Sequence, residues 1–353
     1  MSFATGRVFM AGFEGETVPS ALRELLRNEA LAGVILFRRN IISLPQLSAL
    51  TSELREAAGR DLLIAVDHEG GRVFRMPPPF TQIPPMETIG NYAATHADGE
   101  KLAFDVGRLM GAELAAVGIN VNFAPILDIN TNPKNPIIGN RAFSGDTEQI
   151  ARLGCAMIRG LSEGGVIACG KHFPGHGDTP EDSHRTCPVL PHTLSRLRFM
   201  ELVPFVRAIE AGVPMLMTAH ILYGAIDASQ MVTLSPRAIT GLLREELGYE
   251  GVVVTDDLEM GAVTQMTTPE DAAVRSLAAG CDLALICRDL AVTRRALDAV
   301  AHALDRGALL LPNLERAAAR IAALHRRLTP FSRVRRTEVV GCAAHRMSVE
   351  KLF

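Results

Sequence analysis

Ionisable residues follow several apolar runs of the sequence, and their types are those that nucleophilic and acid–base chemistry requires. Asp256 comes directly after GVVVT, and Asp67 comes directly after LLIAV. Lys171 and His172 lie near the end of a third run, VIACGKHF. A carboxylate can act as a nucleophile, and a histidine can exchange a proton near neutral pH. These four positions are therefore candidates for a catalytic or binding site.

A second group of polar residues lies in FPGHGDTPEDSHRT, a glycine- and proline-rich stretch over residues 173–186. The same stretch holds Asp182 and His184, an aspartate and a histidine two positions apart. For His176 and Asp178, hydrogen bonds within a tight turn are the simpler interpretation. A metal site is an alternative for such a group, but the first apolar run, RVFMAGF, supplies no histidine. We therefore do not expect a catalytic metal here, and the two glycines and flanking prolines would allow this loop to close over a ligand.

Three residues at or beside the ends of the apolar runs could also serve the local backbone structure alone. Asp67 begins the segment DHEGGR, where its carboxylate could accept backbone N–H groups of the following turn. The neighbouring His68 has the same local interpretation. Asp257 could cap a following helix, whereas Asp256 lies deeper in its apolar run.

The elements that must position these residues alternate regularly along the chain. Apolar runs rich in β-branched residues are separated by stretches with helical periodicity. Runs that are apolar throughout are typical of parallel strands buried on both faces, and repeated strand–helix alternation is typical of a (β/α)8 barrel. We predict an α/β fold with such a barrel over residues 1–330, and a doubly wound sheet is the alternative. The expected strands are 7–13, 32–37, 62–67, 119–128, 166–173, 214–221, 251–258 and 282–287.

Several of the intervening stretches carry signals for the ends of helices. Ser235 and Pro236 are typical of the cap and first position of a helix. Gly118, Gly248 and Gly280 are typical of the position just after a helix end. The clearest helical stretches are 44–58, 98–118, 146–164 and 235–248.

A barrel brings the carboxyl ends of its strands together at one face, where loops form the functional site. Asp67, Lys171, His220 and Asp256 all fall at such ends. Arg141 lies in NTNPKNPIIGNRAF, the long segment that follows the fourth run. Charged groups at the same end of five strands are costly to bury without a function.

Composition narrows the class of partner. With 36 Lys+Arg and 39 Asp+Glu residues in 353, the formal net charge is −3, which does not indicate a nucleic-acid surface. No apolar run approaches the about 18 residues of a membrane span, and the N-terminus lacks the layout of a signal peptide. We therefore expect a cytoplasmic protein, a monomer or weak oligomer, with no membrane or nucleic-acid partner.

Cysteines, glycines and aromatic residues add further limits. The six cysteines show no CxxC spacing, so we expect reduced thiols rather than disulfides or a zinc site. No GxGxxG or GxxxxGK[ST] follows the first run, so no nucleotide cofactor is expected. With three Tyr and no Trp, a small soluble substrate is favoured over a polymer. Residues 331–353 form a basic tail, which we expect to pack on the barrel or trail from it.

Three segments together, DHEGGRVFR, KHFPGHGDTPEDSH and VVVTDDLEMGA, resemble glycoside hydrolase family 3. Within that family they are similar to the single-barrel β-N-acetylglucosaminidases of the NagZ type. The resemblance implies removal of non-reducing-end GlcNAc from GlcNAc-1,6-anhydro-MurNAc, with or without peptide, a product of cell-wall turnover. It implies neither a metal nor an organic cofactor.

The same resemblance implies a role for individual residues. Asp256, the first Asp of TDD, matches the nucleophile of a retaining mechanism. His184 matches the acid/base, and Asp182 matches the partner of that histidine. The sugar-contacting residues of the family match Asp67, Arg75, Arg141, Lys171 and His172.

Three other functions stay open. The first is another family 3 specificity, such as β-glucosidase. The second is transfer of the sugar to phosphate, since some members with a histidine acid/base use phosphate in place of water. The third, from a different class, is a sugar-binding regulator without catalysis, although the full set of catalytic residues is present.

Overall fold

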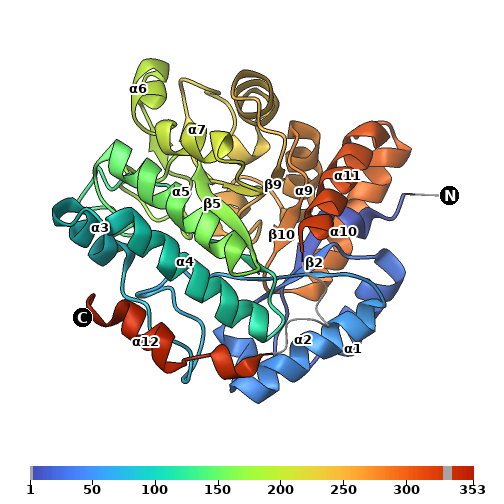
Figure 1. The fold of residues 1–353 in the computed structure, drawn as a ribbon. Helices are drawn as coiled ribbons and strands as arrows, with labels where there is room; N and C mark the ends of the chain where they lie inside the picture. The colour runs from blue at the N-terminus through green and yellow to red at the C-terminus, as the bar shows by residue number, and fades with distance from the viewer. Residues whose placement is uncertain (1–2, 329–335) are drawn as a thin grey trace.

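Eight parallel strands form the centre of the molecule, and the helices surround them (Figure 1). The computed structural model describes residues 3–328 and 336–353. Around the barrel the strands follow one another in chain order, β10-β1-β2-β3-β4-β5-β7-β9. The bounds are β1 Phe9–Ala11, β2 Gly33–Leu36, β3 Leu63–Val66, β4 Val121–Asn122, β5 Ile167–Phe173, β7 Met215–Thr218, β9 Val252–Val254 and β10 Ala284–Ile286.

The strands at the two ends of this order, β10 and β9, also contact each other, and this contact closes the barrel. Val254 of β9 forms a parallel bridge with Leu283, just before β10. The Thr255 N–H donates to the Leu283 carbonyl at 3.0 Å across the same junction. Each strand lies within one of the eight predicted runs, so the predicted (β/α)8 barrel is confirmed and the doubly wound sheet is wrong.

Both faces of the strands are buried, as the continuous apolar runs predict. In β3, Leu63 and Ala65 belong to the cluster that fills the barrel, whereas Ile64 and Val66 pack outward against the helices. Such alternation places every second side chain of a strand inside the barrel.

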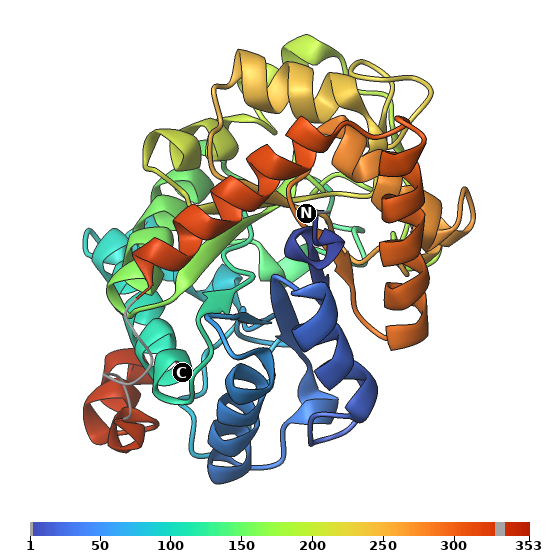
Figure 2. The same ribbon diagram turned by 90° about the vertical axis from the view of Figure 1, so that its right-hand side faces the viewer.

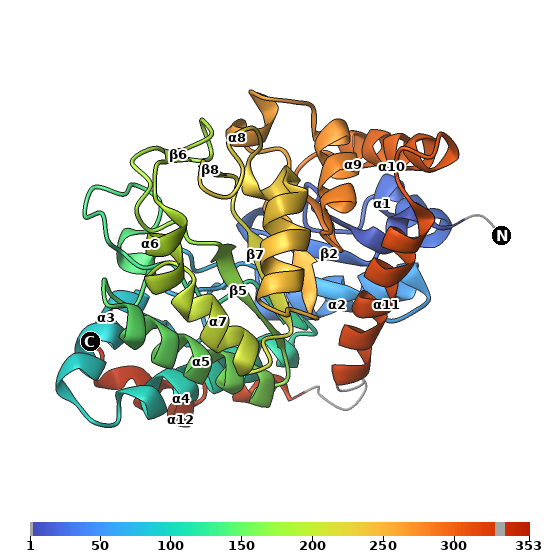
Figure 3. The same ribbon diagram turned by 90° about the horizontal axis from the view of Figure 1, so that it is seen from above.

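Helices connect successive strands and cover the outside of the barrel, as Figure 3 shows. The α-helices are α1 Ser20–Glu24, α2 Leu44–Ala58, α3 Met86–Thr95, α4 Gly99–Ala116, α5 Thr147–Glu163, α6 Leu194–Phe199, α7 Val203–Glu210, α8 Gly261–Thr264, α9 Pro269–Ala279, α10 Leu290–Asp305, α11 Leu311–Arg327 and α12 Ala343–Glu350. Shorter or wider helices are η1 Thr5–Val8, η2 Leu25–Glu29, η3 Arg38–Asn40, η4 Gly139–Arg141, η5 Val232–Leu234, η6 Arg237–Glu246 and η8 Thr337–Val339.

The predicted helices over 44–58, 98–118 and 146–164 are confirmed as α2, α4 and α5. The one expected over 235–248 is η6, a wider helix of the π type, with Pro236 rather than Ser235 at its cap position. The Ser235 hydroxyl, just before it, accepts the Ala238 N–H at 3.2 Å. The three glycines expected after helix ends all have positive φ, at +83°, +67° and +112° for Gly118, Gly248 and Gly280. Such a φ is accessible to glycine at little cost.

Two features beyond the regular barrel lie at its two ends. A two-stranded sheet of β6 (Val189–Leu190) and β8 (Leu222–Tyr223), not predicted from the sequence, follows the ends of β5 and β7. At the opposite end, Ile321 and Leu324 of α11 continue the apolar cluster of the barrel interior. Figure 2 shows α11 running across this region of the molecule. The second end of the barrel is thus closed by a helix.

The described part of the C-terminal segment, 336–353, packs on the barrel beside α4 (Figure 1). Val349 and Leu352 are buried there, and Lys351 donates to Asp98 at 2.9 Å. The predicted boundary between residues 330 and 331 lies outside the described residues. Among those residues, no helix combines the length and the apolar character that a bilayer crossing requires.

Glu113 of α4 joins this segment to the barrel. The buried carboxylate accepts hydrogen bonds from Thr81 N and Oγ1, at 2.9 and 2.6 Å, from Gly341 N at 2.9 Å and from His345 Nδ1 at 2.8 Å. Gly341 has φ +61°, and a Cβ there would lie 1.8 Å from the Pro79 carbonyl oxygen, so only glycine fits. Burial opposes ionisation of Glu113, but these donors hold its pKa below the usual value.

We expect Glu113→Ala to lower the free energy of unfolding by about 2–5 kcal/mol, because it leaves several buried donors without an acceptor. Urea denaturation measures the change. Glu56→Ala, at an exposed position of α2, is the matched control and should change it by less than about 0.5 kcal/mol. Equal effects of the two substitutions would contradict the role of Glu113.

Candidate active site

The carboxyl ends of β3, β5, β7 and β9 bring the predicted residues to one rim of the barrel. Asp67 directly follows β3, and Lys171 and His172 lie near the end of β5. His220 lies just after β7, and Asp256 just after β9. This is the end at which (β/α)8 barrels carry their functional loops.

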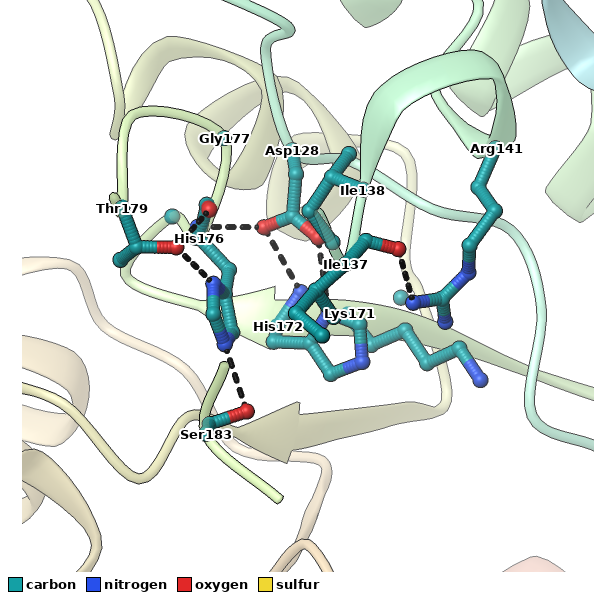
Figure 4. Close-up of polar contacts among 12 residues, drawn as sticks. Asp128, Ile137, Ile138, Arg141, Lys171, His172, His176, Gly177, Thr179 and Ser183 are labelled. Carbon is teal, nitrogen blue, oxygen red and sulfur yellow. Dashed lines mark hydrogen bonds and ion pairs between the residues drawn. The ribbon is translucent and has the colours of Figure 1, made fainter. Parts of the chain in front are cut away.

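Lys171 forms the centre of a charged cluster at this rim. Its Nζ lies 2.6 Å from Asp67 Oδ1 and 2.6 Å from Glu69 Oε1. Arg141 binds the same Glu69 with two parallel hydrogen bonds, from Nε and Nη2, each 2.8 Å long. Figure 4 shows the side chains of Lys171 and Arg141, whose nitrogen atoms share the partner Glu69. Three predicted residues, Asp67, Arg141 and Lys171, are therefore brought together.

The charges of the buried Glu69 and Lys171 are stabilised by their partners. Burial raises the pKa of Glu69, but the Arg141 and Lys171 cations outweigh it and hold that pKa far below its usual value. Burial likewise lowers the pKa of Lys171, and the Asp67 and Glu69 carboxylates outweigh it, so the pKa is raised. The cluster therefore presents fixed charges, which can bind several hydroxyl groups.

Glu69 was not among the predicted site residues. It is 2% exposed, and it pairs with a residue 72 positions away. The signal that could have found it is the presence of two cations, at positions 141 and 171, among apolar residues. Buried cations require a counterion, and Glu69 is the ionisable neighbour of the predicted Asp67.

A second missed residue, Asp128, holds two histidines in place. Its Oδ2 lies 2.7 Å from His172 Nδ1, and its Oδ1 accepts the backbone N–H groups of His172 and His176 at 3.1 and 2.7 Å (Figure 4). Asp128 is fully buried, and His172 helps to keep its pKa below the usual value despite burial. The predicted strand 119–128 contained this residue, but nothing in the sequence marked it as functional.

Asp256 and Asp257 have opposite ionisation behaviour although they are adjacent. Burial raises the pKa of Asp256, but His172, His220, the Asp257 N–H and Lys171 lower it below the usual value overall. Burial raises the pKa of Asp257 to about 7, with smaller contributions from Glu259 and Asp256. Asp256 is thus the carboxylate that is ionised throughout the neutral range.

The expectation that Asp257 caps a helix is wrong. Its Oδ1 accepts the Glu259 N–H at 3.0 Å and the Cys287 N–H at 3.2 Å, and so it ties the turn after β9 to the end of β10. Met260 occupies the cap position of α8 instead. The Asp257 carboxylate therefore holds the turn that carries Asp256.

His220 supports the same turn from β7. Its Nε2 lies 3.0 Å from the Asp257 carbonyl oxygen, and its Nδ1 lies 2.8 Å from Thr233 Oγ1. Burial lowers the pKa of His220, so the ring is neutral near pH 7. Because a carbonyl only accepts, the neutral ring carries its proton on Nε2.

Hydrogen bonds within the segment explain His176, as the local interpretation predicts, but that interpretation is wrong for the Asp178 side chain, whose partners Thr131, His192 and Arg196 lie outside the segment. His176 contacts Thr179 Oγ1 at 2.7 Å and Ser183 Oγ at 2.9 Å (Figure 4), and burial lowers its pKa to about 4. Asp178 accepts from Arg196 Nη2 at 2.9 Å. Both residues anchor the 174–186 loop.

That loop presents the predicted His184–Asp182 pair at the surface. His184 Nδ1 lies 2.9 Å from Asp182 Oδ1, which also accepts the His184 N–H at 2.8 Å. The His184 side chain is 62% exposed, and these hydrogen bonds lower the pKa of Asp182 although its partial burial opposes them. With Nδ1 held by Asp182, Nε2 is the nitrogen left to exchange a proton with a ligand.

In the part of the chain that the structure describes, Arg75 forms no hydrogen bond or ion pair with the charged cluster. Its backbone N–H donates to His68 Nδ1 at 3.4 Å, and its buried Nε has no hydrogen-bond partner among the described residues. Burial lowers the pKa of His68 to about 4, so that ring is neutral and has the predicted local role. Asp67, by contrast, contacts Lys171 rather than serving the turn alone.

One protein family matches most of this chain. A family model described as the glycosyl hydrolase family 3 N-terminal domain matches residues 10–324. The chain belongs to glycosyl hydrolase family 3. The family 3 resemblance drawn from DHEGGRVFR, KHFPGHGDTPEDSH and VVVTDDLEMGA, to single-barrel β-N-acetylglucosaminidases of the NagZ type, is confirmed.

Individual members of the family are similar over most of this chain. A β-hexosaminidase of Chromobacterium violaceum is 43% identical over 279 residues, 79% of this chain and 78% of the relative. A β-N-acetylglucosaminidase of family 3 from Paenibacillus sp. str. FPU-7 superposes with a TM-score of 0.92 at 39% identity, covering 100% of this chain and 68% of that one. NagZ from Neisseria gonorrhoeae in complex with N-trifluoroacetyl-D-glucosamine superposes at 0.83, with 32% identity and coverages of 98% and 96%.

In this family 3 enzyme, we expect Glu69→Gln to weaken sugar binding and to lower the free energy of unfolding by about 3–5 kcal/mol. The amide leaves the buried Lys171 and Arg141 with too little negative charge. KM for an aryl GlcNAc glycoside and urea denaturation measure the two effects. Glu148→Gln, exposed on α5, is the control and should change neither.

The stability effect should also depend on pH. Because the pKa of Glu69 is lower in the folded protein than the ordinary 4.5, its contribution is complete above that pH and shrinks as the pH falls. The difference in unfolding free energy between wild type and Glu69→Gln should therefore narrow from pH 5 to about pH 3. A difference that grows on acidification would contradict the ion-pair cluster.

Proposed function

We propose that the protein is a retaining exo-β-N-acetylglucosaminidase acting on GlcNAc-1,6-anhydro-MurNAc, with or without its peptide, in peptidoglycan recycling. The observation that carries this proposal is the pair of unlike groups at the barrel rim. Asp256 is kept ionised after β9, and the exposed His184–Asp182 pair lies on the 174–186 loop, which follows β5. Retaining hydrolysis requires an anionic nucleophile and a second group that first donates and then accepts a proton, and an imidazole can fill that second role.

In the first half of the reaction, a carboxylate oxygen of Asp256 attacks the anomeric carbon. The bond between that carbon and the glycosidic oxygen breaks, and protonated His184 donates its proton from Nε2 to the leaving oxygen. The products are a covalent glycosyl–Asp256 ester and the free alcohol of the leaving sugar. His172 and Lys171 favour the ionised nucleophile before attack.

In the second half, water replaces the leaving sugar. Neutral His184 takes a proton from that water as its oxygen bonds to the anomeric carbon, and the ester bond to Asp256 breaks. Two displacements at one carbon restore the β configuration. Asp182 contributes by fixing the His184 tautomer and by stabilising the imidazolium.

Asp67, Arg141 and Lys171 bind the hydroxyl groups of the GlcNAc ring, and His172 and Arg75 complete the contacts. The unpartnered Arg75 Nε supports such a role, because a buried donor without an acceptor is costly. The names of similar proteins, β-hexosaminidase and β-N-acetylglucosaminidase, support the sugar. A small soluble substrate, a cytoplasmic location and a monomeric or weakly associating protein complete the proposal.

Substrate choice is tested by comparing 4-nitrophenyl β-GlcNAc with 4-nitrophenyl β-glucoside, each with and without phosphate. Preference for the GlcNAc glycoside without need of phosphate supports the proposal. Preference for glucoside indicates another family 3 specificity, and release of GlcNAc 1-phosphate indicates a phosphorylase. No turnover of either, with retained binding, indicates a sugar-binding regulator. Release of GlcNAc from GlcNAc-1,6-anhydro-MurNAc tests the natural substrate.

We expect Asp256→Ala to abolish turnover and leave the fold intact, because the side chain lies at the rim rather than in the barrel core. In the wild type, an activated 2-fluoro or 5-fluoro sugar should leave an adduct that peptide mass spectrometry maps to Asp256. An adduct on Asp257 or Glu259 reassigns the nucleophile. Early-time NMR should show the β-anomer as first product, and the α-anomer would exclude the covalent mechanism.

We expect His184→Ala to lose about 10²–10⁴-fold in kcat/KM on the disaccharide, the usual contribution of general acid–base catalysis. A dinitrophenyl glycoside has a leaving group that needs no proton, so formation of the glycosyl-enzyme should stay near normal. Azide should then restore turnover and yield the β-glycosyl azide. Asp182→Ala should show the same pattern more weakly. Equal losses on both substrates, without azide rescue, would remove His184 from this role.

A further inference from the structure

The segment that follows Asp256 also contacts the loop that carries His184. The Gly261 N–H donates to the His184 carbonyl at 3.1 Å, and the Ala262 N–H donates to the Ser183 carbonyl at 3.1 Å. The Gln265 side-chain amide donates to the Arg185 carbonyl. Three successive carbonyl groups of the loop, at positions 183–185, are therefore held by residues 261–265.

Gly261 allows this contact because it has no side chain. A Cβ at that position would lie 2.5 Å from the His184 carbonyl oxygen and 2.8 Å from both Cα and O of Arg185. These are backbone atoms, which cannot move aside as the end of a flexible side chain can. Any larger residue at position 261 must displace the His184 backbone.

The other side of the same loop is held from within. His176 Nε2 lies 2.9 Å from Ser183 Oγ, and the His176 N–H is bound to the buried Asp128 at 2.7 Å. Residues 183–185 thus lie between a buried anchor and the 261–265 segment. The buried anchor contacts the Ser183 side chain, and the 261–265 segment contacts backbone carbonyl groups. Neither contact involves the His184 ring.

The 261–265 segment is itself fixed relative to Asp256. Only residues 257–260 separate Asp256 from Gly261. The Met260 N–H donates to the Asp257 carbonyl at 3.1 Å, and His220 Nε2 lies 3.0 Å from that same carbonyl oxygen. The turn is therefore a short, hydrogen-bonded connection between the strand end and α8.

We propose that Gly261 is a positioning residue, which sets the place of the His184 imidazole relative to Asp256 by docking the 183–185 backbone. The inference rests on the proposed roles of Asp256 and His184 and adds the element that couples them. One segment of the chain then carries the nucleophile and receives the acid/base loop. A displacement of this loop by about 1 Å is enough to lower the rate by about 10²-fold.

The test compares Gly261→Ala with Gly224→Ala on two substrates. Gly224, just after β8, has nothing within 4 Å of an added Cβ, so its substitution controls for the loss of a glycine. For Gly261→Ala we expect kcat/KM on the disaccharide to fall about 10–100-fold. Glycosylation by the dinitrophenyl glycoside should change less than about threefold, and azide should accelerate turnover, because only the steps that need His184 are impaired. Gly224→Ala should resemble the wild type on both substrates.

Gln265→Ala keeps the proposal testable if Gly261→Ala does not fold. This variant removes only the hydrogen bond to the Arg185 carbonyl and should show the same selectivity for the poor leaving group, at a smaller magnitude. Wild-type activity of Gly261→Ala on the disaccharide, or equal losses on both substrates, overturns the positioning role. His184→Ala, measured beside them, separates the two proposals. If the activity of His184→Ala does not depend on the leaving group, the proposed function fails. If His184→Ala shows this dependence but the folded Gly261→Ala and Gln265→Ala variants do not, only the docking inference fails.

Discussion

The rest of the rim depends on one interaction, the pairing of the Glu69 carboxylate with Lys171 and Arg141. Lys171 and Arg141 come from different elements, and each would be costly as an unpaired charge in so buried a place. Glu69 accepts from both, with distances of 2.6 to 2.8 Å. Asp67 then lies within 2.6 Å of the same ammonium. One buried anion therefore fixes groups from β3, from the segment after β4 and from β5 in a single arrangement.

Asp128 holds the histidines in place, as Glu69 holds the two cations. It lies after β4, and its two oxygens hold the His172 ring and the backbone N–H groups of positions 172 and 176. Through His176 the same anchor reaches Ser183, next to the proposed acid/base. Two buried carboxylates thus hold the side chains of the candidate site in place. Their value lies in geometry, because a buried acceptor with charged or N–H donors has few alternative arrangements.

Sequence reasoning found the barrel because its signal is local. A parallel strand buried on both faces is apolar at every position, and all eight such runs became strands. It also placed the candidate residues at strand ends, since topology alone decides that. Glu69 and Asp128 were missed because their partners lie 72 and 44 positions away, and composition does not reveal such pairings. Asp257 was misassigned because it accepts the N–H of Cys287, just after the next strand, β10, rather than an N–H of a helix.

The two adjacent aspartates show how the site separates their charges. Side by side, two carboxylates in a buried place would raise each other's pKa, and one would hold a proton. Here the cationic and histidine groups face Asp256, whereas Asp257 is bound by the backbone N–H groups of Glu259 and Cys287 and has a pKa of about 7. The rim thus keeps one anion free beside its cations. A third carboxylate as acid/base would add a further negative charge close to that anion. An imidazole oriented by the more exposed Asp182 avoids this, because it alternates between neutral and positive forms during the proposed reaction.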